Sequence, residues 1–421
     1  MQTFAMMILG CKVNDYEATY LQNKLSQRFT EVPFKEKADC YIIFTCCVTN
    51  MAEAKTRKMF HRARSLNKDA YIVAVGCMSQ IKGDAPDFED VDLVVGSADK
   101  DKLYEMIVKG FKGNQVKDLK GAPFEVLEID SYPGKSRAFV KIQDGCNQFC
   151  SYCIIPFARG RERSASHELL LKQCANLAKK TPEIVLTGIH TGRYADNGYY
   201  LKDLLHDLLK IEELQTIRLS SIEISEINDE IIELMASTDR IGRNLHIPVQ
   251  ALSDTILKAM HRPYTMEEYC ERIAYIRKRI PDISISTDLI VGFPGESDEL
   301  FESSLEMLER IHFSFIHVFP YAAKKGTLAD RMPDKVADIK KKQRVLKIIE
   351  LQKPYKLAYE ATFINKKIKV LVEKSQDGFS FGYSKQYFYV QLDRELPIGQ
   401  LVEAIVTQVD DEGVRAHYVA E

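Results

Sequence analysis

The chain has 421 residues, of which 45% are hydrophobic and 28% are charged, and its net charge at pH 7 is −2. This near-neutral composition is typical of a globular protein with two or three domains, and it excludes nucleic-acid binding through overall charge alone. No apolar run reaches the roughly 18 residues of a membrane span, and Met1–Phe4 lacks the cationic start of a secretory signal. We therefore expect a cytoplasmic protein whose ten cysteines stay reduced and serve as metal ligands rather than disulfides.

Residues 1–125 alternate short apolar runs with helical stretches, which predicts an N-terminal domain built on an open parallel α/β sheet. The expected strands and helices are Phe4–Leu9, Tyr41–Phe44, Tyr71–Val75 and Val91–Val95, with Glu17–Phe29 and Glu53–Leu66. Cys11, Cys46 and Cys77 follow the first three strands. Because the carboxyl ends of parallel strands share one edge of a sheet, topology predicts that these thiols converge. Accidental placement of loop cysteines is the alternative.

Cys46 and Cys47 are adjacent, and successive side chains leaving a strand point in opposite directions. One of the two should therefore face the predicted site; we choose Cys46 as the ligand and keep Cys47 as the alternate. Cys40 begins its strand, at the opposite edge of the sheet, and is expected in the core. Cys174 and Cys270 fall within helical patterns farther along the chain and are also expected to pack.

The alternation of strands and helices resumes after a turn at residues 131–134 and predicts a second domain over residues 132–355. The expected strands are Ala138–Ile142, Ile184–Thr187, Thr216–Ser220, Leu245–Val249, Ile283–Val291 and Phe315–Phe319. The expected helices include His167–Lys179, Ser253–Met260 and Met266–Arg279. This pattern fits a partial (β/α)6 barrel, in which the chemistry lies at the carboxyl ends of the strands.

A motif of C-x3-C-x2-C spacing follows the first strand of this barrel, at Cys146, Cys150 and Cys153. Three thiolates on a short loop can hold three irons of a [4Fe–4S] cluster and leave the fourth iron open for a substrate. A structural zinc site would need a fourth protein ligand, which does not follow at zinc-finger spacing. The motif therefore predicts an iron–sulfur site, and three unrelated buried cysteines are the alternative.

Polar residues and glycines at the strand ends describe a pocket around this loop for a nucleoside-like cofactor. The cofactor-binding candidates are Gly188, Ser221, Glu223, Gln250, Asp288 and Gly292. Glu223 and Gln250 could hydrogen-bond ribose hydroxyls or a charged amino-acid end, whereas the glycines could simply form turns. No side chain is assigned as a catalytic acid or base.

Two groups of basic residues are candidates for RNA binding. Arginines recur at every second position after the cysteine loop, at Arg159, Arg161 and Arg163, which suits phosphate or carboxylate binding, although ordinary surface arginines are the alternative. Residues 334–369 hold eleven Lys or Arg residues against four Asp or Glu residues, a net charge of +7. This basic linker predicts polyanion binding, with further candidates at Lys340, Lys341, Lys342, Lys366 and Lys367.

Short strands separated by turns predict a small antiparallel, OB-like β-barrel over residues 356–421. The expected strands are Lys367–Glu373, Phe379–Tyr383, Phe388–Gln391, Leu401–Val409 and Val414–Tyr418. Aromatic rings that could stack on bases alternate with polar residues at Phe379, Phe381, Tyr383, Tyr387 and Tyr389. The alternative is that these rings form the barrel core, and we expect half of them there.

Together these residues resemble the methylthiotransferases of the radical S-adenosylmethionine (SAM) class over essentially the whole chain. The match in the cysteine loop runs from Lys141 to Pro156. Residues 9–14, Leu-Gly-Cys-Lys-Val-Asn, together with Leu186–Gly192 and Ser220–Glu223, resemble the branch that acts on N6-threonylcarbamoyladenosine in tRNA. The resemblance implies a C-terminal TRAM RNA-binding domain and two [4Fe–4S] clusters, a radical cluster on Cys146, Cys150 and Cys153 and an auxiliary cluster on Cys11, Cys46 and Cys77.

The resemblance further implies conversion of N6-threonylcarbamoyladenosine beside the anticodon to its 2-methylthio derivative, with one SAM as methyl donor and one as radical source. The implied partners are the tRNA anticodon stem-loop and an electron donor such as flavodoxin or ferredoxin. The chain departs from the family at residues 44–49, Phe-Thr-Cys-Cys-Val-Thr, where the family usually has Asn-Thr-Cys-Thr-Val-Thr. Alignment still places the ligand at Cys46, whereas Phe44 removes an amide side chain.

Three other functions stay open from the sequence. A related enzyme acts on isopentenyl-adenosine in tRNA, another modifies an aspartate of a ribosomal protein, and a non-catalytic RNA-binding iron–sulfur protein would share the same motifs. The positive charge of residues 334–369 and the Cys-Lys-Val-Asn signature favour tRNA over a ribosomal protein.

Overall fold

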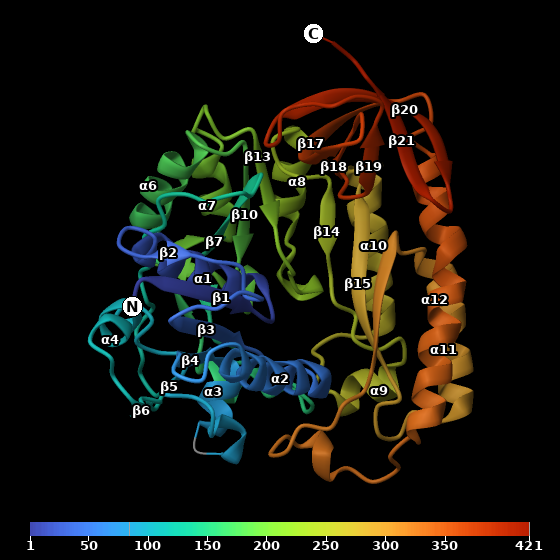
Figure 1. The fold of residues 1–421 in the computed structure, drawn as a ribbon. Helices are drawn as coiled ribbons and strands as arrows, with labels where there is room; N and C mark the ends of the chain where they lie inside the picture. The colour runs from blue at the N-terminus through green and yellow to red at the C-terminus, as the bar shows by residue number, and fades with distance from the viewer. Residues whose placement is uncertain (84, 421) are drawn as a thin grey trace.

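A computed structural model of the chain describes residues 1–83 and 85–420. The polypeptide forms an N-terminal α/β sheet, a central open barrel and a C-terminal β-barrel, which follow one another along the chain (Figure 1). The predicted fold class is therefore confirmed. No helix within the described residues is long and apolar enough to cross a membrane.

The N-terminal sheet is parallel throughout, in the order β2-β1-β3-β4-β5-β6. Its strands are β1 (Thr3–Ile8), β2 (Thr30–Glu31), β3 (Cys40–Thr45), β4 (Tyr71–Gly76), β5 (Leu93–Val95) and β6 (Gly113–Asn114). Helices pack on both faces, namely α1 (Lys12–Leu25), α2 (Asn50–Leu66), α3 (Cys77–Lys82) and α4 (Leu103–Val108). This double cover explains why β3 is buried along its whole length. Helix α1 begins five residues earlier than the sequence predicts, directly after Cys11.

All of the expected barrel strands form, in two parallel ladders of order β13-β10-β7 and β14-β15-β16. They are β7 (Arg137–Lys141), β10 (Glu183–Thr187), β13 (Thr216–Leu219), β14 (Asn244–His246), β15 (Ser284–Val291) and β16 (Phe315–Pro320). Single bridges between Ile217 and Ile241 and between Ser221 and His246 join the two ladders. The result is an open arc whose edge strands are β7 and β16.

The helices of the barrel lie on the outside of this arc (Figure 1). They are α6 (His167–Ala178), α7 (Leu201–Leu208), α8 (Asp229–Ser237), α9 (Asp254–Ala259), α10 (Met266–Arg279) and α11 (Asp298–Ile311). Shorter elements lie in the loops: α5 (Ile155–Arg159), β8 (Gln143–Asp144), β9 (Arg163–Ser164), β11 (Ala195–Asp196) and β12 (Tyr199–Tyr200). Turns of 3-10 helix occur at Pro86–Phe88, Thr191–Arg193, Ile224–Glu226 and Ala329–Arg331.

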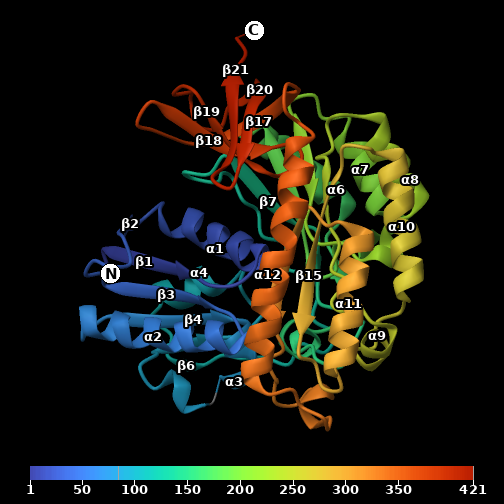
Figure 2. The same ribbon diagram turned by 90° about the vertical axis from the view of Figure 1, so that its right-hand side faces the viewer.

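Most of the predicted basic linker is a long helix, α12 (Asp338–Ala361), which runs along the side of the barrel (Figure 2). The amide of Gln352 pairs with the free edge of β16, accepting from the Ile316 N–H at 2.8 Å and donating to its carbonyl at 3.1 Å. A helix therefore satisfies an edge strand that would otherwise be unpaired. The predicted boundary between residues 355 and 356 falls inside α12, and the domain limits 1–125, 132–355 and 356–421 stay predictions.

The C-terminal strands close into a barrel of order β17-β18-β19-β21-β20. They are β17 (Lys367–Gln376), β18 (Phe379–Ser384), β19 (Tyr389–Leu392), β20 (Leu401–Asp410) and β21 (Gly413–Tyr418). Neighbouring strands are antiparallel except for the β19–β21 pair, which is parallel. Arg218 of β13 donates to the carbonyls of Ser384 and Lys385 at 2.8 and 3.0 Å and so fastens this barrel to the central one.

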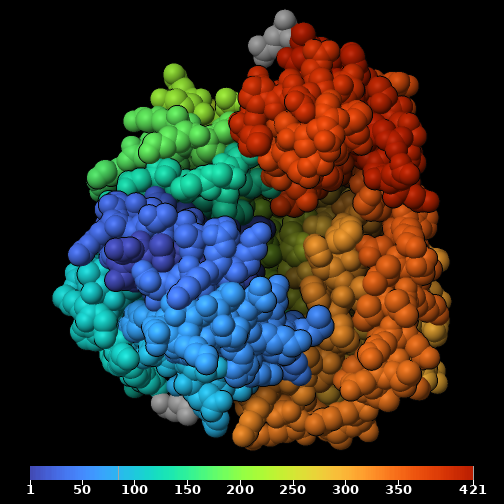
Figure 3. Space-filling model, in the orientation of Figure 1, coloured from blue at the N-terminus to red at the C-terminus, as the bar shows by residue number. Residues whose placement is uncertain are grey.

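The three parts are packed against one another. The hydrophobic core of the central barrel includes Tyr16 and Tyr20 from α1, so the N-terminal part covers the open side of the arc next to β7. The opposite edge strand, β16, is covered by α12. A hollow remains between the N-terminal sheet, α12 and the C-terminal barrel (Figure 3).

Candidate iron–sulfur and cofactor sites

The cysteine loop begins directly after β8, at the carboxyl end of β7. Gly145 has φ +73°, and an added Cβ would lie 2.0 Å from the carbonyl oxygen of Arg161, so the loop closes only with glycine at this position. The Ser151 hydroxyl donates to the Ala259 carbonyl at 2.7 Å and ties the loop to α9. The thiols on this anchored loop are half-buried at Cys146, Cys150 and Cys153.

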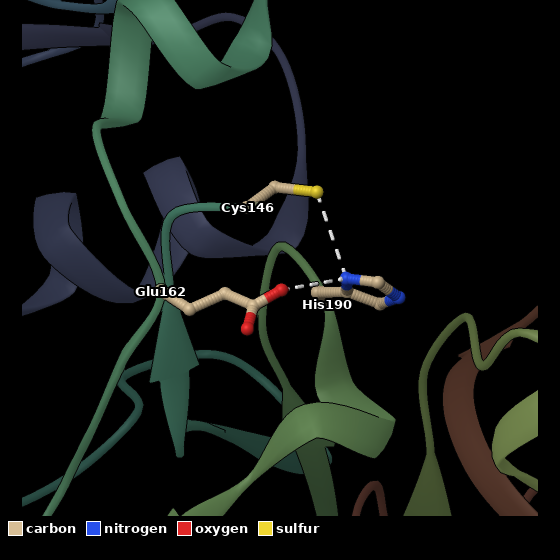
Figure 4. A group of neighbouring side chains, drawn as sticks. All are labelled: Cys146, Glu162 and His190. Carbon is tan, nitrogen blue, oxygen red and sulfur yellow. Dashed lines mark hydrogen bonds and ion pairs between the residues drawn. The ribbon is translucent and has the colours of Figure 1, made fainter. Parts of the chain in front are cut away.

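His190 lies beside Cys146, with its Nδ1 3.5 Å from the Cys146 Sγ (Figure 4). The same Nδ1 is 3.3 Å from the Glu162 Oε1, and the Nε2 is 2.7 Å from the Glu226 Oε1. Burial alone would lower the pKa of His190, but hydrogen bonds with Cys146 and Glu226 raise it to about 10. A protonated ring offers its Nδ1–H to the Cys146 sulfur and the Glu162 carboxylate, and its Nε2–H to Glu226. The sequence predicted no role for this histidine, although it stands two residues beyond Gly188 at a strand end.

Cys146, Glu162 and His190 could also coordinate a single metal ion, because one ligand atom from each lies within 4.8 Å of the others. An iron–sulfur cluster fits the loop better, since it uses all three of the cysteines. The Gln148 N–H also donates to the Cys146 Sγ at 3.4 Å. Donors aimed at ligand sulfurs are typical of iron–sulfur sites, where they tune the cluster.

Arg262 is the neighbour of the second cysteine, with its Nη1 3.5 Å from the Cys150 Sγ. Its Nη2 forms an ion pair with Glu223, and its Nε donates to the Tyr264 hydroxyl at 3.1 Å. Glu223 therefore holds Arg262 in the structure, and its predicted contact with a cofactor stays a prediction. No pattern in the sequence marks Arg262, because it follows a helix rather than a barrel strand.

The structure brings Cys11, Cys46 and Cys77 to the same edge of the N-terminal sheet. Cys11 precedes α1, Cys46 follows β3 and Cys77 begins α3. Gly10 has φ +107°, and an added Cβ would lie 3.3 Å from the Cys46 Sγ, so the backbone before Cys11 closely approaches the second thiol. Their ligation of an auxiliary cluster stays a prediction, and the thiol chemistry of the set fits it.

Cys47 lies next to Cys77, and their thiols are within hydrogen-bonding reach. The hydrogen bond from Cys47, assisted by the guanidinium of Arg159, lowers the pKa of Cys77 although burial acts in the opposite direction. Both neighbouring cysteines thus approach the predicted site, because β3 ends at Thr45 and the strand alternation does not continue into the loop. The choice of Cys46 over Cys47 stays a prediction.

Arg159 ends α5, the short helix that follows the radical-loop cysteines, and its side chain reaches the N-terminal cysteine set. Its Nε donates to the Cys77 Sγ at 3.1 Å, its Nη1 to the Glu17 Oε1 at 2.6 Å and its Nη2 to the Asn14 Oδ1 at 2.5 Å. Lys141 also pairs with Glu17, at 3.0 Å, and the pKa of Glu17 is held well below its usual value against the effect of burial. The prediction that Arg159 contacts RNA is wrong, because its side chain is fully buried.

A cavity of about 260 Å³ lies between the cysteine loop and the N-terminal part. Gln250 and Asp288, two of the cofactor candidates, line it beside Cys153. Asp288 also lines a larger cavity of about 630 Å³, together with Ser221. The structure therefore places three of the candidates in cavities at the barrel interior, and their contact with a cofactor stays a prediction.

The two glycine candidates approach the protein itself. An added Cβ at Gly188 would lie 3.0 Å from the Gln143 carbonyl oxygen, and one at Gly292 would lie 2.4 Å from the Lys341 Cγ of α12. Within the described residues, neither glycine lines the two cavities that Asp288 shares. The close backbone approach predicted at both positions is present toward the protein itself, and cofactor contact by Gly188 and Gly292 stays a prediction.

The remaining basic candidates differ in exposure and pairing. Arg161 is exposed and lies over the Phe149 ring, 4.4 Å from its centroid, whereas Arg163 is half-buried and donates to Asp144 at 3.0 Å. Three of the lysines pair with carboxylates at 2.5 to 3.1 Å: Lys340, Lys341 and Lys367. Two are exposed and form no ion pair within residues 1–83 and 85–420: Lys342 and Lys366. RNA contact by all of these residues stays a prediction.

The predicted aromatic residues of the C-terminal barrel all lie outside its core. Three are exposed and two are half-buried: Phe379, Tyr387 and Tyr389, and Phe381 and Tyr383. Tyr383 stacks on Tyr387 with 4.7 Å between ring centroids, and Phe381 on Tyr389 with 6.1 Å. The expectation that half of them form the core is wrong, because the core consists of aliphatic side chains, six of them valines, together with Phe363 and Phe388. The stacked rings present a surface on which bases could stack.

Two protein-family models match separate stretches of the chain. The Radical SAM superfamily matches residues 140–308, and Uncharacterized protein family UPF0004 matches residues 3–96. The chain is 37% identical to the threonylcarbamoyladenosine tRNA methylthiotransferase of Bacillus subtilis, over 96% of this chain and 93% of the relative. A protein of the same name from Aquifex aeolicus is 36% identical, over 96% and 99%. The tRNA-2-methylthio-N(6)-dimethylallyladenosine synthase of Pelotomaculum thermopropionicum is 34% identical, over 91% and 90%.

Among solved structures, the radical SAM methyltransferase TsrM of Kitasatospora setae is similar, with a TM-score of 0.55 and 15% identity over 78% of this chain and 77% of that one. At this identity the likeness shows the fold alone. The radical SAM family implies SAM and a [4Fe–4S] cluster as cofactors. The identity to the methylthiotransferases is above 30% over nearly their whole length, which shows a common family in addition to a common fold. The chain therefore belongs to the radical SAM methylthiotransferase family.

Proposed function

We propose that this protein converts N6-threonylcarbamoyladenosine next to the tRNA anticodon to its 2-methylthio derivative. One SAM would be the methyl donor and another the radical source. The substrate is supported by the names of the Bacillus subtilis and Aquifex aeolicus relatives, at 37 and 36% identity respectively. The enzyme would work in the cytoplasm, with flavodoxin or ferredoxin as electron donor.

The observation that carries the chemistry is the meeting of two cysteine sets from different domains at α5. Ile154 and Ala158, which follow the radical SAM loop, pack in the same hydrophobic cluster as Cys46 and Cys77. Arg159, at the end of the same helix, donates to the Cys77 sulfur. Removal of hydrogen from a substrate and delivery of sulfur to it require two neighbouring centres, and α5 sets their separation.

In this function Cys146, Cys150 and Cys153 would hold the radical cluster, and Cys11, Cys46 and Cys77 an auxiliary cluster. When bound, the first cluster and SAM supply a 5′-deoxyadenosyl radical, and the second cluster supplies the sulfur. The chain's own residues tune these ligands, since His190 and Arg262 place donors beside the radical-loop sulfurs. Such donors stabilise the thiolates on which ligation depends.

The cavity beside Cys153 is the best site for SAM. Gln250 and Asp288 line it from the barrel, and Val48 and Thr49 line it from the N-terminal part. The N-terminal part thus closes the cavity from the side opposite the barrel. This enclosure would orient the cofactor and limit the water that reaches a radical formed there.

The alternative substrate is isopentenyl-adenosine in tRNA, and the 34% identity to the Pelotomaculum thermopropionicum enzyme favours it as the second candidate. Nucleoside mass spectrometry of tRNA distinguishes the two. A strain that lacks the gene should lose 2-methylthio-N6-threonylcarbamoyladenosine and accumulate its unmethylthiolated precursor. The wild-type gene should restore the product, and a Cys150→Ser copy should not. Loss of the isopentenyl product instead would reject the proposed substrate.

A further inference from the structure

The larger cavity, of about 630 Å³, opens between the three parts of the molecule, at the hollow seen in Figure 3. Its volume lies within the range of ligand pockets. Aromatic rings from the C-terminal barrel form one wall, among them Tyr383, Tyr387 and Tyr389. Polar side chains of the central barrel, including Ser221 and Asp288, line the interior. Such a mixed lining suits a modified nucleoside at the end of an RNA loop.

Lys12 reaches this cavity from the first position of α1. A cation at the amino end of a helix opposes the helix dipole, so helix stability does not account for this lysine. Lys12 is half-buried, and its ammonium forms no ion pair or hydrogen bond with the residues that the structure describes. A partly desolvated charge without a partner is unfavourable, and an anionic group in the cavity would relieve this cost.

The other permanent cations of the cavity wall already have partners. The Arg218 Nε is 2.8 Å from the Glu183 Oε2, and the Lys356 Nζ is 2.9 Å from the Glu360 Oε2. Among the described lining residues, Lys12 is therefore the permanent cation that remains available to a ligand. An anionic group of a ligand in this cavity would therefore pair with Lys12.

We propose that Lys12 binds the carboxylate of the threonylcarbamoyl group on the target adenosine and so determines which modified adenosine is accepted. This inference rests on the proposed function. N6-Threonylcarbamoyladenosine carries a free carboxylate on its 6-substituent, whereas isopentenyl-adenosine carries a hydrocarbon there. A hydrocarbon in front of Lys12 would desolvate the ammonium without pairing it, so the site discriminates against that substrate.

The place of Lys12 in the chain suits this role. Lys12 directly follows Cys11, a proposed ligand of the auxiliary cluster from which sulfur would be transferred to C2 of the adenine. The 6-substituent belongs to the same ring system, so an adenine that presents C2 to this site can extend its substituent into the cavity. The exposed rings of Tyr387 and Tyr389 would then be available to neighbouring bases of the loop.

The test measures binding of anticodon stem-loop RNAs to cluster-loaded protein, under anaerobic conditions and without reductant. The RNAs carry threonylcarbamoyladenosine, its carboxamide analogue or unmodified adenosine at the target position. Lys12→Met should weaken binding of the first RNA by about ten- to a hundredfold, the usual contribution of one charged hydrogen bond, and leave the unmodified RNA unchanged. The wild type should lose the same factor with the carboxamide, to which the variant should be insensitive.

Two variants serve as controls. Lys12→Arg keeps the charge and should retain most of the preference for the carboxylate RNA. Lys24→Met removes the same charge from the exposed, opposite end of α1, so any effect on RNA binding should be equal for all three RNAs. Iron content and circular dichroism equal to those of the wild type show that a variant has folded around its clusters.

The inference is overturned if Lys12→Met keeps the wild-type preference for the carboxylate RNA, or loses affinity equally for all RNAs. If that variant does not fold, the wild type alone decides, because equal binding of the carboxylate and carboxamide RNAs contradicts a pairing with Lys12. Failure of the proposed function has a different signature. In that case the wild-type gene would not restore the 2-methylthio product in the tRNA of the strain that lacks it.

Discussion

Replacement of Arg159 by methionine should loosen the junction between the N-terminal sheet and the central barrel. The fully buried guanidinium donates to Cys77, Glu17 and Asn14 at 3.1, 2.6 and 2.5 Å. Methionine replaces much of the aliphatic stem but none of the donors. The change should therefore lower stability and also alter the auxiliary cluster, because one of the lost hydrogen bonds ends on a proposed ligand sulfur.

The size of both effects follows from these contacts. Breaking a buried ion pair by removing one partner costs about 3–5 kcal/mol. The lower end applies because Glu17 keeps Lys141 at 3.0 Å and Lys100 at 3.4 Å. A loss of roughly 3 kcal/mol, at about 2 °C per kcal/mol, lowers Tm by about 6 °C. A hydrogen bond that favours the reduced auxiliary cluster over the oxidised one by tenfold raises the reduction potential of that cluster by about 60 mV. Arg159→Met should therefore lower this potential by about 60 mV.

Thermal unfolding followed by circular dichroism measures the first effect. A potentiometric titration followed by electron paramagnetic resonance measures the second, in protein whose radical-loop cysteines are replaced by alanine so that the auxiliary cluster is observed alone. Arg161→Met is the matched control, because Arg161 is exposed and should change neither quantity. A Tm of Arg159→Met within about 1 °C of wild type would refute the ion-pair reasoning. An unchanged potential would refute the contact with the cluster ligand.

Three further predictions concern the other candidate residues. Cys46→Ala should lose the iron of the auxiliary cluster and Cys47→Ala should keep it; iron and sulfide analysis showing the reverse would move the ligand by one position. Gln250→Asn, which suits the left-handed backbone at φ +66°, should weaken SAM binding about tenfold in equilibrium dialysis, and unchanged affinity would remove this residue from the site. Tyr389→Ala should weaken stem-loop binding about tenfold without lowering Tm, because one base stack contributes ~1–3 kcal/mol and the ring is 46% exposed; unaltered RNA affinity would exclude this face.

Local patterns were sufficient for most of the architecture. The apolar runs of the N-terminal sheet and of the central barrel predict the right strands, because strands buried on both faces need continuous hydrophobic sequence. The sequence predicts a linker over residues 334–369, whereas most of this region is α12, a helix that packs on a distant partner. Its Gln352 is a polar residue buried by pairing with the backbone of Ile316, which no local pattern reveals.

The sequence by itself determined the spacing of the radical-loop cysteines and the parallel strands whose carboxyl ends gather Cys11, Cys46 and Cys77 at one edge. Only the tertiary structure decided that Arg159 is buried and contacts Cys77, and that Lys12 faces a cavity without a partner. The physical reason is one of range. Sequence spacing fixes the relative positions of residues that lie a few positions apart or at the ends of strands in one sheet. The burial and pairing of a long charged side chain depend instead on which distant segment packs over it.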